Sequence, residues 1–286
     1  MASGKYVAYV GTYTRHNSIG IHIFDIDSEK WSMTERKVVP INNPSDLIVS
    51  ADGRFLYSIA DGIFHEGIGC SNADHNFIPH VTCVKLTVDQ KYLCAVDSGL
   101  DHVKVYEVDY ENGKLKLFNI IRGHIDSAPR MIRFRRELYC VYVLCEGDNN
   151  IYVYHYKTDK CMAKGMELVQ IIGTSDTTEN IPYAASGIEF SPDGKHLFVT
   201  NAGINTAMIY DVDKETGLLT KNCENSLGGD YPKTVAVMPD NEHFIALNNG
   251  GNEICIFRMN YDKKYFLMDS KPIKIERPNA IFIHEL

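Results

Sequence analysis

The stretch Ala184–Leu219, AASGIEFSPDGKHLFVTNAGINTAMIYDVDKETGLL, holds the pattern that decides the fold. It contains a short apolar strand, the Asp-Gly turn of SPDG, a second apolar strand, an Asn/Gly turn and a third, alternating strand. Alternating apolar residues bounded by Asp-Gly and Asn-Gly turns are typical of antiparallel β-hairpins. The stretch therefore predicts a small antiparallel sheet, and no part of the chain shows a sustained helical period.

The same pattern returns along the chain about every fifty residues. It recurs in PHVTCVKLTVDQKYLCAVDSG from Pro79, in PRMIRFRRELYCVYVLCEG from Pro129 and in PKTVAVMPDNEHFIALNNGG from Pro232, and its first half occurs in PSDLIVSADGRFLYSIAD from Pro44. A four-stranded sheet of this length cannot bury both of its faces alone. Stacking such sheets around an axis buries them, and the repeat therefore predicts a β-propeller.

The two ends of the chain share one repeat unit. The C-terminal RPNAIFIHEL resembles the first strand of a unit, and the N-terminal KYVAYVGTYTRHNSIGIHIFDIDSEKW resembles the other three strands. One blade would then combine both ends and close the ring. We therefore expect a single all-β propeller domain over residues 1–286, with four-stranded antiparallel blades and unit starts near residues 44, 79, 129, 184, 232 and 278.

Composition disfavours several classes of partner. The formal net charge is −8, whereas binding to nucleic acid needs a basic face. No run approaches the roughly 18 apolar residues of a membrane span. The N-terminal MASGKYVAYVGTYT has no basic-then-apolar signal peptide. We expect a cytoplasmic protein that binds neither nucleic acid nor membrane, and the sequence does not indicate its oligomeric state.

The cysteines and histidines give no metal motif. None of the eight cysteines forms a C-x-x-C pair. Most lie in apolar runs such as YLCAVD, which predicts buried, reduced thiols. His65, His75 and His80 fall in one polar stretch, but they lack the spacing and the carboxylate partners of a metal site. We expect no metal.

Four stretches resemble a known family: YVGTYTRHNSIGIHIFDID, SPDGKHLFVTNAG, DYPKTVAVMPDNEHF and the closing RPNAIFIHEL. They look like the bacterial 6-phosphogluconolactonase family, whose members are seven-bladed lactonase propellers similar in fold to fungal carboxymuconate lactonising enzymes. The resemblance covers essentially the whole chain. A WD-repeat propeller does not fit, because no unit closes with a Trp-Asp pair.

Compared with that family pattern, about one blade is missing between residues 61 and 63. FLYSIAD runs directly into GIFHEGIG, and the unit starts near residues 44 and 79 are closer together than any other pair. We therefore expect six units, one of them incomplete, in place of the seven blades typical of the family.

Lactone opening transfers an acyl group to water, which requires a base or nucleophile and a donor that stabilises the oxyanion. His80 follows Pro79 and Arg130 follows Pro129, so the two appear at matching repeat positions and should both point toward the propeller axis. Glu146 ends the next strand of the Arg130 unit. The sequence predicts that these three side chains converge at one mouth of the channel.

The resemblance implies the same three residues as a catalytic set, because the family's proposed active-site His, Arg and Glu map onto His80, Arg130 and Glu146. The Glu context departs from the family pattern, reading CEG. Lys233, in YPKTV, stands where many relatives have Arg and is expected to contact the substrate phosphate. The resemblance implies hydrolysis of an anionic sugar lactone, most directly 6-phosphogluconolactone in the pentose phosphate pathway, without a cofactor.

Several alternatives stay open at this point. Either His80 or Glu146 could be the general base. Each candidate also has a structural interpretation: His80 as a hydrogen-bonded channel residue, Arg130 as a partner of backbone carbonyls, and Glu146 as a solvated turn carboxylate. Other possible functions are a muconate-type lactonising cycloisomerase and a catalytically impaired propeller that acts as a binding or scaffold module.

Overall fold

The computed structural model describes residues 6–14, 19–49, 53, 56–58, 79–87, 89–156 and 166–285. The regular elements in these ranges are β-strands and one 3₁₀ turn at Arg136–Leu138. None of the described residues belongs to a helix that is long and apolar enough to cross a lipid bilayer. The chain divides into two compact units: unit 1 comprises Met1–Ala60, Ser175–Val212 and Thr220–Leu286, and unit 2 comprises Asp61–Thr174 and Asp213–Leu219.

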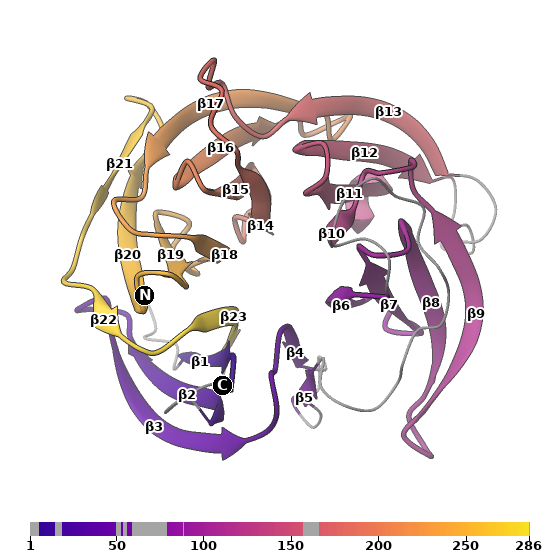
Figure 1. The fold of residues 1–286 in the computed structure, drawn as a ribbon, viewed down its shortest axis with the longest axis horizontal. Helices are drawn as coiled ribbons and strands as arrows, with labels where there is room; N and C mark the ends of the chain where they lie inside the picture. The colour runs from indigo at the N-terminus through magenta and orange to yellow at the C-terminus, as the bar shows by residue number, and fades with distance from the viewer. Residues whose placement is uncertain are drawn as a thin grey trace. The chain divides into compact units, whose positions relative to one another are not determined.

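Unit 1 contains three large antiparallel sheets and one small one (Figure 1). The first sheet has the order β23 (Pro278–Glu285), β1 (Tyr6–Thr12), β2 (Gly20–Asp27) and β3 (Ser32–Pro40). The second runs β14 (Ala184–Phe190), β15 (His196–Ala202), β16 (Thr206–Val212) and β17 (Leu219–Ser226). The third runs β18 (Pro232–Val237), β19 (His243–Asn248), β20 (Glu253–Asn260) and β21 (Tyr265–Met268), with β22 (Ile273–Lys274) also paired to β20. The small sheet pairs β4 (Leu47–Val49) with β5 (Leu56–Ser58).

Unit 2 contains two four-stranded antiparallel sheets. One runs β6 (Val81–Leu86), β7 (Tyr92–Asp97), β8 (His102–Asp109) and β9 (Lys114–Arg122). The other runs β10 (Pro129–Arg135), β11 (Cys140–Cys145), β12 (Asn150–Tyr156) and β13 (Met166–Gly173).

The described ranges form five full sheets rather than six. The unit expected near residue 44 contributes only the two-stranded sheet β4–β5, and residues 59–78, which follow β5, lie outside the described ranges. The strands nearest the two chain ends lie in one sheet, because β1 pairs with β23 from Tyr6 opposite Glu285 to Thr12 opposite Pro278.

The hairpins form where the local sequence predicts them. In SPDG, Gly194 adopts a φ of 69°, a value that glycine tolerates without steric cost. The Gly194 N–H donates to the Ser191 carbonyl at 2.8 Å, and the Ser191 hydroxyl donates to the Asp193 carboxylate at 2.7 Å. The turn thus satisfies its own polar groups and sets the register of β14 against β15.

Apolar side chains from neighbouring sheets of unit 1 form a shared core. Phe244 on β19 is fully buried, and its ring centroid lies 5.1 Å from Phe198, 5.1 Å from Phe257 and 5.0 Å from Phe266. These rings join the β14–β17 sheet to the β18–β21 sheet. Burial of this aromatic cluster therefore stabilises the stacking of the two sheets.

We predict that Phe244→Ala lowers the free energy of unfolding by about 3–5 kcal/mol, because it opens a cavity among three other rings. Denaturant unfolding followed by circular dichroism measures the change. Leu267→Ala is the control: Leu267 is 64% exposed, so its truncation should change the stability by less than about 0.5 kcal/mol. Equal effects of the two substitutions would contradict this role of the aromatic cluster.

Candidate active site

A β-bulge interrupts the first strand pairing of each full sheet. In unit 2 the register shifts at Arg130 on β10 and at Thr82 on β6. In unit 1 it shifts at Ser186 on β14 and at Lys233 on β18. A bulge residue leaves the hydrogen-bonding ladder, and the bend in the strand re-aims its side chain. Arg130 and Lys233, the two cationic candidates, therefore share one repeat position.

The predicted equivalence of His80 and Arg130 is wrong. In the sheet of β6 the residue at the bulge is Thr82, and it is the repeat match of Arg130. His80 lies two residues before Thr82, so its match in the sheet of β10 is Ala128. The backbone shows the same relation: Ser98 N–H donates to the His80 carbonyl, and Glu146 N–H donates to the Ala128 carbonyl, each at 3.0 Å. Two side chains that start from different repeat positions do not share a direction.

Arg130 and Glu146 form a direct ion pair. Arg130 Nη1 lies 2.6 Å from Glu146 Oε2, and the side chains are 12% and 24% exposed. Arg130 leaves β10 at its bulge, and Glu146 follows the last residue of β11, so one hairpin brings the two together. Charge-assisted hydrogen bonds of this kind are short and strong. The pair places a carboxylate and a guanidinium side by side.

The backbone around this pair is closely fitted. Glu146 N–H donates to the Ala128 carbonyl and Gly147 N–H donates to the Ser127 carbonyl, each at 3.0 Å. A Cβ atom on Gly147 would lie 2.4 Å from the Asp126 carbonyl oxygen. Position 147 therefore requires glycine, because the turn after β11 packs backbone to backbone against the loop that leads into β10.

The neighbouring thiol is not a candidate nucleophile. Cys145 is buried directly before Glu146, and burial raises the pKa of its thiol. A thiol with a raised pKa is not the reactive thiolate at neutral pH. The six cysteines in the described ranges are free, and all but Cys223 are buried, in agreement with the reduced, buried thiols that the sequence predicts.

His80 is held by its own sheet. Its backbone N–H donates to the carboxylate of the buried Asp97 at 2.8 Å, and its Nδ1 lies 3.5 Å from Ser98 Oγ. The imidazole is exposed. The Thr82 hydroxyl donates to the Arg130 carbonyl at 2.7 Å, so the beginnings of β6 and β10 lie side by side in unit 2. The structure joins Arg130 to Glu146 directly, and it places His80 just before the neighbouring first strand.

Lys233 belongs to unit 1 and is partly buried at the bulge of β18. Its Nζ lies 5.3 Å from the ring centroid of Tyr231, a distance typical of a cation–π contact. Tyr231 is 43% exposed and adopts a φ of 54°. The sequence did not single out Tyr231, although it stands two residues before Lys233.

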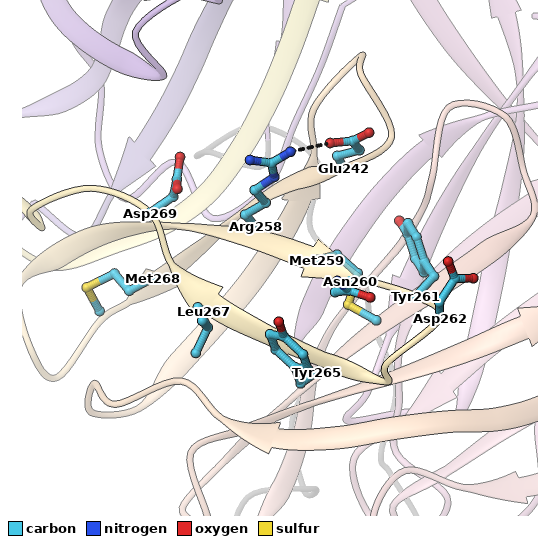
Figure 2. A pocket seen from close by; sticks show the side chains of 10 residues that line it. All are labelled: Glu242, Arg258, Met259, Asn260, Tyr261, Asp262, Tyr265, Leu267, Met268 and Asp269. Carbon is cyan, nitrogen blue, oxygen red and sulfur yellow. Dashed lines mark hydrogen bonds and ion pairs between the residues drawn. The ribbon is translucent and has the colours of Figure 1, made fainter.

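Unit 1 also has a surface groove of about 570 Å³ along β20 and β21 (Figure 2). It contains an exposed ion pair, in which Arg258 Nη2 lies 3.2 Å from Glu242 Oε2. Tyr261, Tyr265 and Leu267 are among its other lining residues. None of the predicted site residues lies in this groove.

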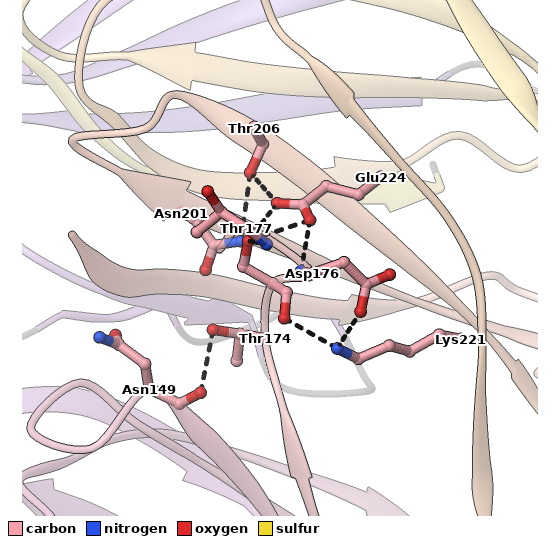
Figure 3. Close-up of polar contacts among 9 residues, drawn as sticks. Asn149, Thr174, Asp176, Thr177, Asn201, Thr206, Lys221 and Glu224 are labelled. Atoms are coloured by element: carbon pink, nitrogen blue, oxygen red, sulfur yellow. Dashed lines mark hydrogen bonds and ion pairs between the residues drawn. The ribbon is translucent and has the colours of Figure 1, made fainter. Parts of the chain in front are cut away.

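A second polar cluster of unit 1 surrounds Glu224 on β17 (Figure 3). Its carboxylate accepts hydrogen bonds from the hydroxyls of Ser175 and Thr206 and from the Asp176 backbone. Lys221 Nζ lies 2.6 Å from Asp176 Oδ1. These groups satisfy one another, which indicates a structural role in holding the segment that follows β13.

No group of three His, Cys, Asp or Glu side chains in the described part of the chain is arranged to hold a metal ion. His65 and His75, considered for that role from the sequence, lie outside the described residues.

Comparison with known proteins decides the family. The sequence profile described as "Lactonase, 7-bladed beta-propeller" matches residues 7–67 and 62–283. The chain belongs to this family. The fold is accordingly an all-β propeller of small antiparallel sheets.

Individual relatives are distant but span the chain. The 6-phosphogluconolactonase of Bacillus subtilis is 21% identical over 352 aligned positions, covering 99% of this chain and 99% of that protein. The 6-phosphogluconolactonase of Formosa agariphila is 23% identical, covering 87% of this chain and 91% of that protein. The structure of the periplasmic gluconolactonase PpgL of Pseudomonas aeruginosa superimposes with a TM-score of 0.83 at 18% identity, covering 98% of this chain and 99% of that one.

The alignments agree with the loss of positions from this chain relative to the family. The lactonase profile matches in two pieces that meet at residues 62–67, next to the junction where the sequence predicts a missing blade. The alignment with the Bacillus subtilis protein runs over 352 positions, more than the 286 residues of this chain, so it contains positions that this chain lacks.

We predict that Gly147→Ala lowers the free energy of unfolding by about 1–3 kcal/mol, because the new methyl group overlaps backbone that has no room to move. Hydrogen exchange should also speed up in residues 124–128. Gly251→Ala is the matched control, because a Cβ there first meets the flexible side chain of Glu253 at 3.3 Å. An unchanged stability and exchange rate in Gly147→Ala would show that the backbone fit is not tight.

Proposed function

We propose that this chain is a propeller lactonase that hydrolyses a sugar lactone, with 6-phospho-D-glucono-1,5-lactone as the favoured substrate and 6-phosphogluconate as the product. The observation that carries the proposal is the partly buried Arg130–Glu146 pair at 2.6 Å. Family membership and the 6-phosphogluconolactonases among the relatives support the reaction class. The enzyme would act in the pentose phosphate pathway of the cytoplasm.

The proposed mechanism requires one base and one donor to the developing oxyanion. Glu146 or His80 takes a proton from water as the water oxygen attacks the lactone carbonyl carbon. Arg130 donates hydrogen bonds to the carbonyl oxygen, which becomes negatively charged in the tetrahedral intermediate. The intermediate then expels the ring oxygen, which receives a proton and becomes the free hydroxyl of the acid. This sequence needs no redox step and no intermediate covalently bound to the enzyme.

In this proposal Lys233 binds the phosphate of the substrate. An ammonium group is a suitable point charge for phosphate, and the contact with Tyr231 at 5.3 Å limits the positions available to it. A relative that carries Arg at this place would gain bidentate geometry that Lys233 cannot supply.

We further propose that residues 1–286 form one propeller domain of six units, one of them incomplete. The pairing of β1 with β23 would close the ring without a covalent link. The family profile that breaks at residues 62–67 supports the loss of about one blade at that point.

That same break favours a second candidate function, a catalytically impaired propeller that serves as a binding or scaffold module. A purified protein that does not accelerate lactone hydrolysis above the spontaneous rate would support this candidate over the lactonase.

We predict that Arg130→Ala and Glu146→Gln each lower kcat/KM for 6-phosphogluconolactone by about 100-fold or more, because each removes a group used in the transition state. His80→Ala should have an effect of that size if His80 is the base. Continuous measurement of acid release, corrected for spontaneous hydrolysis, gives the rates.

Arg258→Ala and Glu242→Gln are matched controls, because these residues form an exposed Arg–Glu pair outside the proposed site. They should leave the rate unchanged. If His80→Ala, Arg130→Ala and Glu146→Gln all keep the rate of the unmodified protein, the site assignment is wrong.

We predict that Lys233→Ala lowers kcat/KM for the phosphorylated lactone by about 10- to 100-fold, as expected for loss of a hydrogen bond to a charged group. Its activity on unphosphorylated D-glucono-1,5-lactone should not fall. Lys233→Arg keeps the charge and should restore most of the activity on the phosphorylated substrate. A loss of equal size on both lactones would exclude Lys233 as the phosphate contact.

A further inference from the structure

A left-handed Asx residue recurs in the turn between the second and third strands of four full sheets. The φ values are 48° at Asp101, 55° at Asn149, 56° at Asn205 and 53° at Asn252. Asn and Asp are the residues other than glycine that adopt this conformation most readily. The backbone carbonyl of each of these residues accepts a hydrogen bond from the backbone N–H of the first residue after the last strand of its own sheet. In the same order, the donors are Gly123, Thr174, Leu227 and Ile275.

The side chains of Asn205 and Asn252 fix the connection to the next sheet. Asn205 Oδ1 accepts the backbone N–H of Tyr231 at 3.0 Å, and Asn252 Oδ1 accepts that of Arg277 at 3.0 Å. Each acceptor is a single amide oxygen. The donor in each case lies one residue before the first strand of the next sheet, β18 or β23. The Asx residue therefore holds the backbone at the entry to that strand.

Asp101 occupies the same place before the Arg130 strand, but it is a carboxylate and uses both oxygens. Its Oδ1 accepts the N–H of Ala128 at 2.8 Å, and its Oδ2 accepts the N–H of Asp126 at 2.9 Å. Asp101 is only 6% exposed. Both donor residues have left-handed backbones, with φ values of 60° at Asp126 and 46° at Ala128. Such conformations persist where the surrounding contacts fix them.

Ala128 links this carboxylate to the ion pair. Its N–H binds Asp101, and its carbonyl accepts the N–H of Glu146 at 3.0 Å. Arg130 follows two residues later at the bulge. The buried carboxylate, the loop 124–128 and both members of the Arg130–Glu146 pair thus form one connected set of contacts within unit 2.

We propose that Asp101 is the positioning residue of the Arg130–Glu146 pair. Its carboxylate holds the loop 124–128 in the one conformation from which the Arg130 guanidinium meets Glu146. The catalytic consequence of this inference rests on the proposed lactonase function, and its structural part does not.

Asparagine cannot replace Asp101 fully. The amide offers one oxygen acceptor, and its NH₂ group would face the second backbone N–H. Asp101→Asn therefore keeps the left-handed residue type of the other three sheets and loses one of the two loop contacts. Asn252→Ala is the matched control: it removes one hydrogen bond from the same repeat position, before a strand that carries none of the proposed site residues.

The test compares kcat, KM and the thermal midpoint of Asp101→Asn, Asp101→Ala and Asn252→Ala, with 6-phosphogluconolactone as substrate. We expect kcat of Asp101→Asn to fall ~10- to 100-fold, as for a small misplacement of catalytic groups, and KM to change little. Asp101→Ala should lose more activity. Asn252→Ala should lose thermal stability but keep kcat. The inference is overturned if Asp101→Asn keeps its kcat, or if Asn252→Ala loses as much kcat.

A second measurement applies whether or not the unmodified protein hydrolyses the lactone. The NMR signal of the Arg130 Nε–H group is identified by its disappearance in Arg130→Lys. Asp101→Asn should shift or broaden this signal, and Asn252→Ala should leave it in place. If the unmodified protein has no lactonase activity, the proposed function fails alone. If the Arg130 signal is the same in Asp101→Asn, the positioning role fails.

Discussion

The β-bulge in the first strand pairing of each sheet decides which side chains leave the sheet. At two bulges the residue is a hydroxyl that reaches the next first strand: Thr82 donates to the Arg130 carbonyl at 2.7 Å, and Ser186 donates to the Pro232 carbonyl at 2.6 Å. At two others it is a cation, Arg130 or Lys233. One backbone feature thus joins neighbouring first strands at some sheets and places a cationic side chain outside the hydrogen-bonding ladder at others.

The hairpins and the strand boundaries could be predicted from the sequence because their causes are local. Alternating apolar residues and Asp-Gly turns act over a few residues, and the first strands begin at Leu47, Val81, Pro129, Ala184, Pro232 and Pro278, near the predicted unit starts. Blade count could not be obtained in this way. The described ranges contain five full sheets and the two-stranded sheet β4–β5, and residues 59–78, which follow β5, lie outside those ranges.

The equivalence of His80 and Arg130 failed because Pro79 and Pro129 take different places in their sheets: Pro129 is the first residue of β10, whereas Pro79 lies two residues before β6. Pro129 pairs directly with Cys145, whereas the residue in the matching pair of β6 is Val81, opposite Asp97. In both pairs the partners are sixteen residues apart. A count of sixteen residues back from the last residue of the second strand gives Pro129 in one sheet and Val81 in the other. This count matches Arg130 with Thr82, the bulge residue of β6, and not with His80.

Arg130 and Glu146 could be predicted as a pair because both lie on one hairpin. The register of β10 against β11 brings the two side chains together. The role of Asp101 could not, since it depends on two hydrogen bonds to residues 25 and 27 positions away. A signal was nevertheless present in the sequence: the turn that reads Asn at Asn149, Asn205 and Asn252 reads Asp only in the unit before Arg130.

The central claim is that Arg130 and Glu146 act as one catalytic unit. A double-mutant cycle on lactone hydrolysis, with Arg130→Ala, Glu146→Gln and the double substitution, tests it most directly. Residues that act as a unit have strongly non-additive effects, so the double variant should be about as slow as the slower single variant. If the two losses multiply in full, or if neither single substitution slows hydrolysis, the two residues do not form a catalytic pair.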